Sequence, residues 1–133
     1  MSIQLAMVGL VVSDMTRSLE FYRLLGLDIP VEEDEKRFVM HRMPSGVTIF
    51  FDTVFFPAND SERRPAPRGS YNISLEFYAG TREAVDRLYA DLTGFGYVGR
   101  KPPWKSTGPY AAIVEDPDGN PILITAEDPG AEI

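Results

Sequence analysis

The apolar and polar positions of the chain follow the same order twice. In the first half, residues 5–12 form an apolar run of strand length, and Met15, Leu19 and Tyr22 then fall at the i, i+4 and i+7 spacing of one helix face. Gly26 marks the end of that helix. Three further apolar runs predict strands at residues 27–31, 37–43 and 47–53. The first half therefore predicts the order β-α-β-β-β.

The second half repeats this order. Residues 72–78 form its first apolar run, and Val85, Leu88 and Leu92 then form the apolar stripe of a helix that ends near Gly94. Strands are again predicted after the helix, at residues 97–100, 110–115 and 121–125. The second half therefore predicts β-α-β-β-β as well.

The two halves align with a small slip. Thr16 and Thr81, which follow the first strand of each half, are 65 positions apart, whereas the helix stripes match better at a step of 66, which pairs Leu19 with Val85. The repeat is therefore structural rather than literal. Extended back along the strands, the step of 65 makes Asn72 the counterpart of Met7.

Two βαβββ modules in tandem predict a single domain of the α+β class. The modules span residues 1–53 and 71–126, a linker rich in Pro and charge covers 54–70, and 127–133 form a tail. Phe55 and Phe56 stand together in this linker. Because large aromatic side chains are rarely left exposed in pairs, we expect them to pack against the core or against a partner subunit.

Composition and net charge indicate the cellular compartment and the class of ligand. A chain of 133 residues with 44% apolar residues can form a core without crosslinks, and the absence of Cys removes disulfides and thiolate metal sites. No stretch approaches the about 18 apolar residues of a membrane helix, and the N-terminus lacks a signal-peptide pattern. We therefore expect a cytoplasmic protein without membrane contact. A net charge of −7 argues against nucleic-acid binding and favours a neutral or cationic small ligand.

Three motifs together resemble one known superfamily. They are VGLVVSD at residues 8–14, RSLEFY at 17–22 and DPDGN at 116–120, within the duplicated βαβββ order. This combination resembles the vicinal oxygen chelate superfamily, which includes glyoxalases, bleomycin-resistance proteins and extradiol dioxygenases. The resemblance covers nearly the whole chain. It implies a curved mixed sheet shaped as a cup with helices outside, and a homodimer, with modules exchanged or not.

In the metal enzymes of that superfamily, four inward positions carry His, Glu or Gln. The resemblance maps these positions onto Met7, Phe50, Asn72 and Leu123. Thioether, phenyl and alkyl groups are not ligands for a first-row divalent metal, and one Asn oxygen does not make a site. The only His, His41, lies in the middle strands of the first module, away from these positions. The sequence therefore predicts no metal site and no cofactor.

Strand alternation identifies the side chains that would line the cup, because residues two apart share a face. If the four mapped positions point inward, the residues that share their faces are Gly9, Val11, Thr48, Asp52, Ser74, Glu76 and Thr125. Among them, Asn72, Ser74 and Glu76 make a polar stripe on an otherwise apolar strand. Such a stripe is also typical of an ordinary strand with one wet face. If it lines a cavity, Glu76 or Asp52 could pair with a cationic ligand or act as a base.

A stiff aromatic loop stands near the expected mouth of the cup. Trp104 lies in KPPWK at 101–105, and Tyr110 follows Gly108-Pro109. The loop resembles the aromatic-bearing loop of bleomycin-resistance proteins, and its indole could stack on a planar or cationic ligand. Packing of Trp104 at the end of the core is the simpler alternative.

These observations lead to one first hypothesis and two others. The first is a metal-independent small-molecule-binding protein that holds a planar or cationic ligand in the cup or at a dimer groove, on walls formed by Met7, Phe50, Asp52, Asn72, Ser74, Glu76, Trp104, Tyr110 and Leu123. The second is a lyase or isomerase in which Glu76 accepts a proton and Asn72 stabilises an enolate-like oxygen. The third is a metal-dependent enzyme with displaced ligands.

Overall fold

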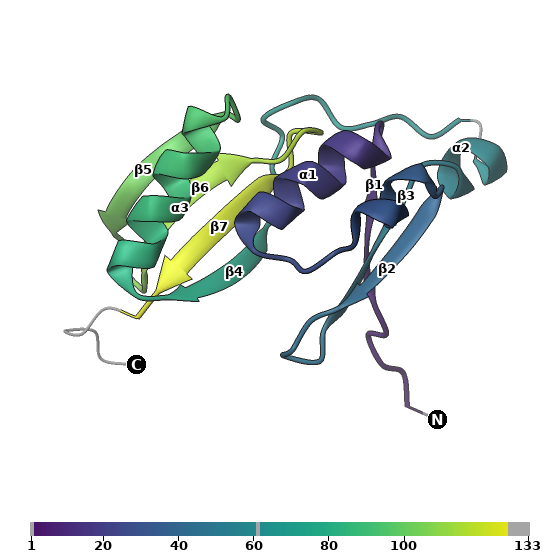
Figure 1. The fold of residues 1–133 in the computed structure, drawn as a ribbon. Helices are drawn as coiled ribbons and strands as arrows, with labels where there is room; N and C mark the ends of the chain where they lie inside the picture. The colour runs from purple at the N-terminus through teal and green to yellow at the C-terminus, as the bar shows by residue number, and fades with distance from the viewer. Residues whose placement is uncertain (1, 61, 128–133) are drawn as a thin grey trace. The chain divides into compact units, whose positions relative to one another are not determined.

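The computed structural model describes residues 2–60 and 62–127 (Figure 1). The chain divides into two compact units, Met1–Pro65 and Ala66–Ile133. Each unit contains one mixed β-sheet and the helix that follows its first strand. The α+β class predicted from the sequence is therefore confirmed.

The first unit contains a three-stranded sheet in the order β1-β3-β2. Strand β1 runs parallel to β3, and β2 runs antiparallel to β3. The elements of this unit are β1 (Val8–Val11), α1 (Met15–Leu25), the 3-10 helix η1 (Val31–Glu35), β2 (Phe38–Arg42), β3 (Thr48–Asp52) and α2 (Phe55–Asn59).

One predicted strand of the first unit is absent from the structure. Residues 27–31 are not a strand: Leu27 and Ile29 are buried, and the chain then turns into η1. Pro30 caps η1 and has no N–H to donate to a neighbouring strand. The acidic residues that follow form the rest of η1. Asp34 of η1 makes an ion pair with Arg23 of α1 at 2.6 Å, which holds η1 against that helix. Three strands rather than four therefore form this sheet.

The second unit matches the predicted βαβββ order. Its four-stranded sheet has the order β4-β7-β6-β5, with β4 parallel to β7 and the other pairs antiparallel. The elements are β4 (Leu75–Gly80), α3 (Arg82–Gly94), β5 (Gly99–Lys105), β6 (Tyr110–Glu115) and β7 (Pro121–Ala126). Strand β5 begins two residues later than the predicted strand 97–100. It also ends later, because it includes the segment KPPWK.

The core of the first unit lies between α1 and its sheet. Asp14 caps the helix by accepting a hydrogen bond from the Arg17 N–H, and this fixes which face of α1 is turned inward. Tyr22 of α1 packs on Phe51 of β3 with ring centroids 5.1 Å apart. Leu10 and Val39 pair with Phe51 in register. All are buried, and each large apolar side chain contributes about 1.5–3 kcal/mol on burial.

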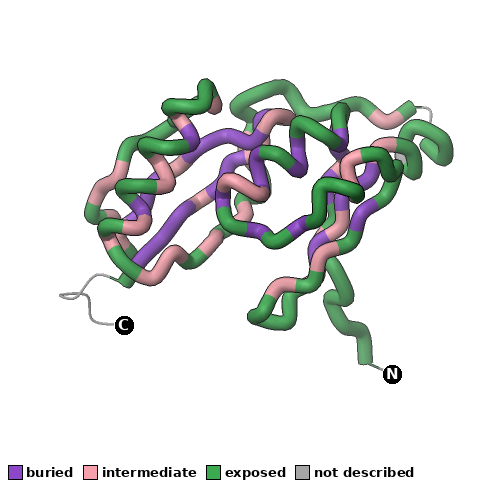
Figure 2. The backbone as a smooth tube through the Cα atoms, in the orientation of Figure 1, coloured by how far each residue is buried: buried purple, intermediate pink, exposed green. Residues whose placement is uncertain are grey.

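The core of the second unit lies between α3 and its sheet, and buried residues run along β6 and β7 (Figure 2). Thr81 caps α3 by accepting a hydrogen bond from the Ala84 N–H. Val85 and Leu92 of α3 are fully buried. At Gly99 of β5, an added Cβ would lie 2.3 Å from the Tyr89 hydroxyl of α3. A larger residue at this position would displace the Tyr89 side chain.

The connecting segment holds a short helix that the sequence did not predict. The Phe55 side chain in α2 is 57% exposed, so it does not pack in the core, and its packing against a partner subunit stays a prediction. The side chain of Phe56 and the tail residues 128–133 lie outside the described residues. Across the described part of the chain, none of the helices has the length and hydrophobicity that a membrane crossing requires.

Candidate functional site

Each sheet has one face turned to its helix and one face turned away, which we call its open face. In the first unit, Phe51 contacts α1, so the residues that alternate with it lie on the open face. Residues of β1 and β2 that pair with these residues of β3 lie on the same face. The open face of the first unit therefore carries Gly9, Val11, Phe38, Met40, Arg42, Thr48 and Phe50, with Met7 just ahead of β1.

An aromatic platform occupies this open face. The rings of Phe38 and Phe50 stack with centroids 5.3 Å apart and planes 28° from parallel. The tip of Phe50 lies over Gly9, where an added Cβ would be 2.0 Å from Cζ. Phe38 is 47% exposed and Met40 is 56% exposed. We call Phe38, Met40 and Phe50 the platform, and it presents ring faces and a thioether to solvent.

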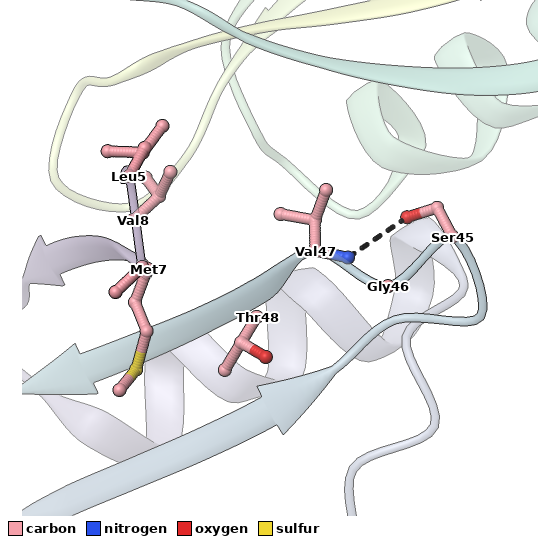
Figure 3. Close-up of a pocket in the computed structure, with 8 residues that line it drawn as sticks. Leu5, Met7, Val8, Ser45, Gly46, Val47 and Thr48 are labelled. Carbon is pink, nitrogen blue, oxygen red and sulfur yellow. Dashed lines mark hydrogen bonds between the residues drawn. The ribbon is translucent and has the colours of Figure 1, made fainter. Parts of the chain in front are cut away.

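A pocket of about 290 Å³ lies just ahead of the first β1–β3 pair. It is lined by residues 5–8 and by residues 45–48 of the β2–β3 turn. Figure 3 shows Met7 and Thr48 pointing to the same side, with Val47 on the other side of the strand. The Ser45 hydroxyl oxygen accepts a hydrogen bond from the Val47 N–H at 3.5 Å, which shapes the turn. The pocket therefore places Met7 and Thr48 at one end of the open face.

Asp52 has a structural role in this unit. Its side chain is buried, and one carboxylate oxygen accepts hydrogen bonds from the N–H groups of Val54 and Phe55, both at 2.8 Å. These are the first N–H groups around α2, which have no partner within the helix. This carboxylate is therefore engaged by the backbone and is not presented to a ligand.

The open face of the second unit carries Glu76. Tyr110 of β6 and Gly99 of β5 contact α3, so they lie on the helix side of the sheet. Tyr110 pairs with Ala126 of β7, and the alternating residues Thr125 and Leu123 therefore lie on the opposite side, as does Glu76, which pairs with Leu123. Glu76 is exposed, and its carboxylate accepts a hydrogen bond from the Thr125 hydroxyl at 3.0 Å. Leu123 pairs with Glu76 in register and is half-buried. The structure thus brings Glu76 and Leu123 together as predicted.

Trp104 belongs to the same open face, but a cation of the chain already covers its ring. Trp104 pairs with Ala111, which pairs with Thr125. The Lys101 ammonium lies 4.3 Å from the Trp104 ring centroid. This cation–π contact occupies the position that a cationic ligand would take.

Tyr110 lies on the other side of the sheet from Trp104. Its hydroxyl donates a hydrogen bond to Asp86 of α3 at 2.6 Å, and the Arg82 guanidinium lies 4.8 Å from its ring centroid. The hydrogen bond to Asp86 and partial burial raise the pKa of the Tyr110 phenol. The structure therefore places Tyr110 at the helix interface and not with Glu76.

The modules align by a step that differs from the one used on the sequence. The capping residues Asp14 and Thr81 are 67 positions apart, and so are Gly9 and Glu76, which pair with Phe50 and Leu123 in their sheets. At this step the counterpart of Met7 is Ser74 rather than Asn72. Asn72 is exposed and lies three positions before β4. The error arose because the two threonines matched on the sequence stand at different distances from their helix caps.

The corrected set of mapped positions is Met7, Phe50, Ser74 and Leu123. A serine hydroxyl in place of the Asn amide leaves this set without imidazole, carboxylate or thiolate donors, so these residues do not fit a first-row metal. His41 pairs with Ile49 and faces the helix side of its sheet. Among the described residues, no three His, Cys, Asp or Glu side chains are grouped so that they could hold a metal ion.

Alternation along β2 adds residues that the sequence analysis did not consider. Phe38 and Met40 complete the platform, and Arg42 pairs with Thr48 at its end. The Pro44-Ser45-Gly46 turn was visible in the sequence, and a two-strand hairpin across it would have paired Met40 with Phe50. In the second unit, Lys101 lies in the same KPPWK segment as Trp104.

Comparison with known proteins now identifies the family. The model of the Glyoxalase/Bleomycin resistance protein/Dioxygenase superfamily matches residues 4–124. The chain belongs to this superfamily. No curated protein matches the sequence, so the superfamily itself, with its several activities, is the level of assignment.

Several solved structures share the fold. A hypothetical protein from S. aureus is 23% identical with a TM-score of 0.77, over 94% of both chains. A glyoxalase/bleomycin resistance protein/dioxygenase family enzyme from Burkholderia phytofirmans PsJN is 20% identical with a TM-score of 0.72, over 91% of this chain and 96% of that one. A glyoxalase/bleomycin resistance protein from Albidiferax ferrireducens T118 is 26% identical with a TM-score of 0.69, over 93% and 98%.

Proposed function

We propose that this chain is a metal-independent small-molecule-binding protein of the glyoxalase/bleomycin-resistance type. The platform of Phe38, Met40 and Phe50 is the observation that carries the proposal. Stacked rings and a thioether left open to solvent favour contact with a flat ligand, since ring–ring and sulfur–ring contacts are strongest on planar partners. Exposed apolar surface of this kind marks interaction sites in small proteins.

The donor chemistry at the mapped positions supports binding without a metal. Met7 and Phe50 stand where the metal enzymes of the superfamily carry ligands in the first module, and both belong to the open face beside the platform. Side chains that cannot ligate a metal can still form an apolar wall. The ligand is planar, and a cationic group on it finds less support, because Lys101 already covers Trp104.

Calorimetric titration with three planar probes of different charge tests this proposal. We use 2-naphthamide, 2-naphthoate and N-methylquinolinium with the wild type, Phe50→Ala and the control Phe95→Ala. Phe95 is 66% exposed and follows α3, in the other unit, so it tests the loss of an exposed phenyl ring elsewhere. We expect binding of at least one probe, a loss of about tenfold in affinity in Phe50→Ala, and no change in Phe95→Ala. Equal affinities in all three proteins would contradict the proposal.

A second candidate function is a lyase or isomerase that uses Glu76 as the base. The observation in its favour is the position of Glu76 on the open face, with its carboxylate oriented by the Thr125 hydroxyl. A neighbouring hydroxyl can hold a base in one orientation, and a base acts when it lies within hydrogen-bond reach of the substrate proton. Turnover of a bound carbonyl compound that disappears in Glu76→Gln, with affinity retained, would establish this function. Recovery of every bound ligand unchanged would exclude it.

A further inference from the structure

We propose that the ligand of the first unit is a planar carboxylate, with its ring on the platform and its acid group on the guanidinium of Arg42. This inference rests on the proposed function and narrows its ligand class. Arg42 pairs with Thr48 at one end of β2, next to the pair formed by Met40 and Phe50. Side chains at diagonal positions of neighbouring strands lie about 7–8 Å apart, so the long Arg42 side chain can reach the acid group of a ring that stacks on Phe50.

Arg42 is available for such a partner. It is exposed, and its guanidinium makes no hydrogen bond or ion pair with any other residue of 2–60 and 62–127. One of its guanidinium nitrogens lies 3.9 Å from the position that a Cβ added at Gly46 would take. A guanidinium presents two parallel N–H donors that match a carboxylate, whereas an amide or a cation cannot use both.

No other charge on this open face competes with Arg42. The Asp52 carboxylate is buried and accepts the N–H groups of Val54 and Phe55. The remaining side chains of the face are uncharged: Val11, Phe38, Met40, Thr48 and Phe50. The net charge of −7 acts weakly at this site, because physiological salt screens exposed charges beyond about 8 Å. The local cation therefore sets the sign of the preferred ligand.

The Thr48 hydroxyl and the adjoining pocket supply the rest of the acid-binding end. Thr48 pairs with Arg42 and lines the pocket of about 290 Å³ together with Met7. A hydroxyl can donate to the second oxygen of a carboxylate that Arg42 holds. The pocket gives room for a ring substituent of a few atoms beyond the platform.

Three matched pairs of planar compounds test the assignment: benzoate and benzamide, 2-naphthoate and 2-naphthamide, and cinnamate and cinnamamide. Each is titrated calorimetrically into the wild type, Arg42→Gln, Arg42→Lys and the control Arg37→Gln. Arg37 is an exposed arginine directly before β2, on the opposite alternation to Phe38. We expect the wild type to prefer the acid of each bound pair by about tenfold, and this preference to fall as ionic strength rises.

Arg42→Gln is expected to bind acid and amide alike, with amide affinity unchanged, while Arg42→Lys keeps part of the preference and Arg37→Gln keeps all of it. Equal binding of acid and amide by the wild type would overturn the inference and leave planar binding standing. A preference that survives in Arg42→Gln would overturn the role of Arg42. If none of the six compounds binds, this inference fails, and the proposed function fails as well when N-methylquinolinium does not bind either.

Discussion

At the scale of single residues, the platform depends on Gly9. The ring of Phe50 lies over the backbone of β1, and only a residue without a Cβ leaves this space. Phe50 then lies between Phe38 on one side and β1 on the other, so its ring is already placed on the open face before a ligand arrives. Preorganised contacts of this kind raise affinity, because less side-chain freedom is lost on binding.

Replacing Gly9 with alanine is expected to displace the Phe50 ring, since the new Cβ would lie 2.0 Å from Cζ. The ring can swing toward solvent, so we expect a loss of about 1 kcal/mol or less in the free energy of unfolding. Affinity for 2-naphthamide should fall about as far as in Phe50→Ala. Urea denaturation and calorimetry measure the two effects.

Gly108→Ala is the matched control, because an added Cβ there meets nothing closer than 3.9 Å. It is expected to keep the affinity of the wild type. A Gly9→Ala protein with unchanged affinity would show that the position of Phe50 does not matter for binding.

Some side chains of the site could be placed from the sequence and others could not. Strand alternation correctly placed Phe50, Leu123 and Glu76 on open faces, because each lies inside a regular strand. Alternation could not show that the Asp52 carboxylate caps a helix, since α2 falls in a segment rich in Pro and charge. Tyr110 was assigned to the mouth by its loop, but its hydrogen bond to Asp86 depends on how α3 crosses the sheet.

At the scale of secondary-structure elements, a buried carboxylate anchors the segment that leads into β4. Glu115 at the end of β6 accepts a hydrogen bond from the Tyr71 hydroxyl, and Arg68 pairs with it at 3.2 Å. The Arg100 guanidinium lies 3.9 Å from the same carboxylate and 5.5 Å from the Tyr71 ring centroid. The two arginines compensate the buried charge, so the contact holds residues 68–71 at the end of the sheet.

The Tyr71 contact predicts a loss of stability at alkaline pH. Burial first, and then the Glu115 carboxylate, raises the pKa of the Tyr71 phenol above its ordinary value of 10.0. A raised pKa means that the stabilisation is complete below about pH 10 and is lost as pH rises through the value in the folded protein. Tyr71→Phe should unfold more easily than the wild type by about 1 kcal/mol at pH 8, and this difference should shrink above pH 10.

Urea denaturation at a series of pH values measures this difference, and a double-mutant cycle with Glu115→Gln isolates the pair. The pKa values of Tyr78 and Tyr110 are also raised, and these residues are present in both the wild type and Tyr71→Phe. Their effect on the pH dependence of stability therefore cancels when the two proteins are compared. A difference between Tyr71→Phe and wild type that stays constant through alkaline pH would contradict the account.

The elements that the sequence predicted well are those with strong local signals. Both long helices have a capping residue and a regular apolar stripe, and their bounds follow from these. The segment 27–31 was predicted as a strand because it is apolar, yet Pro30 and the acidic run after it favour η1. Burial of Leu27 and Ile29 satisfies the apolar pattern without a strand. A short apolar run therefore indicates burial more reliably than it indicates pairing.

At the scale of the whole molecule, family membership accounts for the fold. The side chains on the open faces account for the proposal that this chain binds a ligand without the metal that the enzymes of the family use. The duplicated order together with the VGLVVSD, RSLEFY and DPDGN motifs indicated the superfamily, which the match over residues 4–124 confirms. Matched by the resemblance and by the register of the two sheets, the metal-ligand positions of that family correspond to Met7, Phe50, Ser74 and Leu123. We propose that the chain acts as a homodimer, since large apolar side chains such as Ile3, Leu5 and Ile73 are 97%, 88% and 77% exposed.

Analytical ultracentrifugation checks this assembly over a range of concentrations. We expect a mass of about twice 14.9 kDa, and a shift toward the monomer when Leu5 is replaced by Asp. Thr16→Asp, a change at an exposed position of α1, is the control for added charge. A monomer at all concentrations would contradict the proposed dimer.

The central claim is that the platform binds a planar ligand without a metal, and NMR titration of the isotopically labelled protein tests it most directly. 2-Naphthamide is added in the presence of EDTA, and the titration is repeated with excess Zn²⁺, Ni²⁺ or Mn²⁺ in place of the chelator. We predict the largest shifts at Phe38, Met40 and Phe50, with the same dissociation constant in EDTA and in Zn²⁺. Binding that appears only with a metal, or shifts confined to residues away from β2 and β3, would contradict the account.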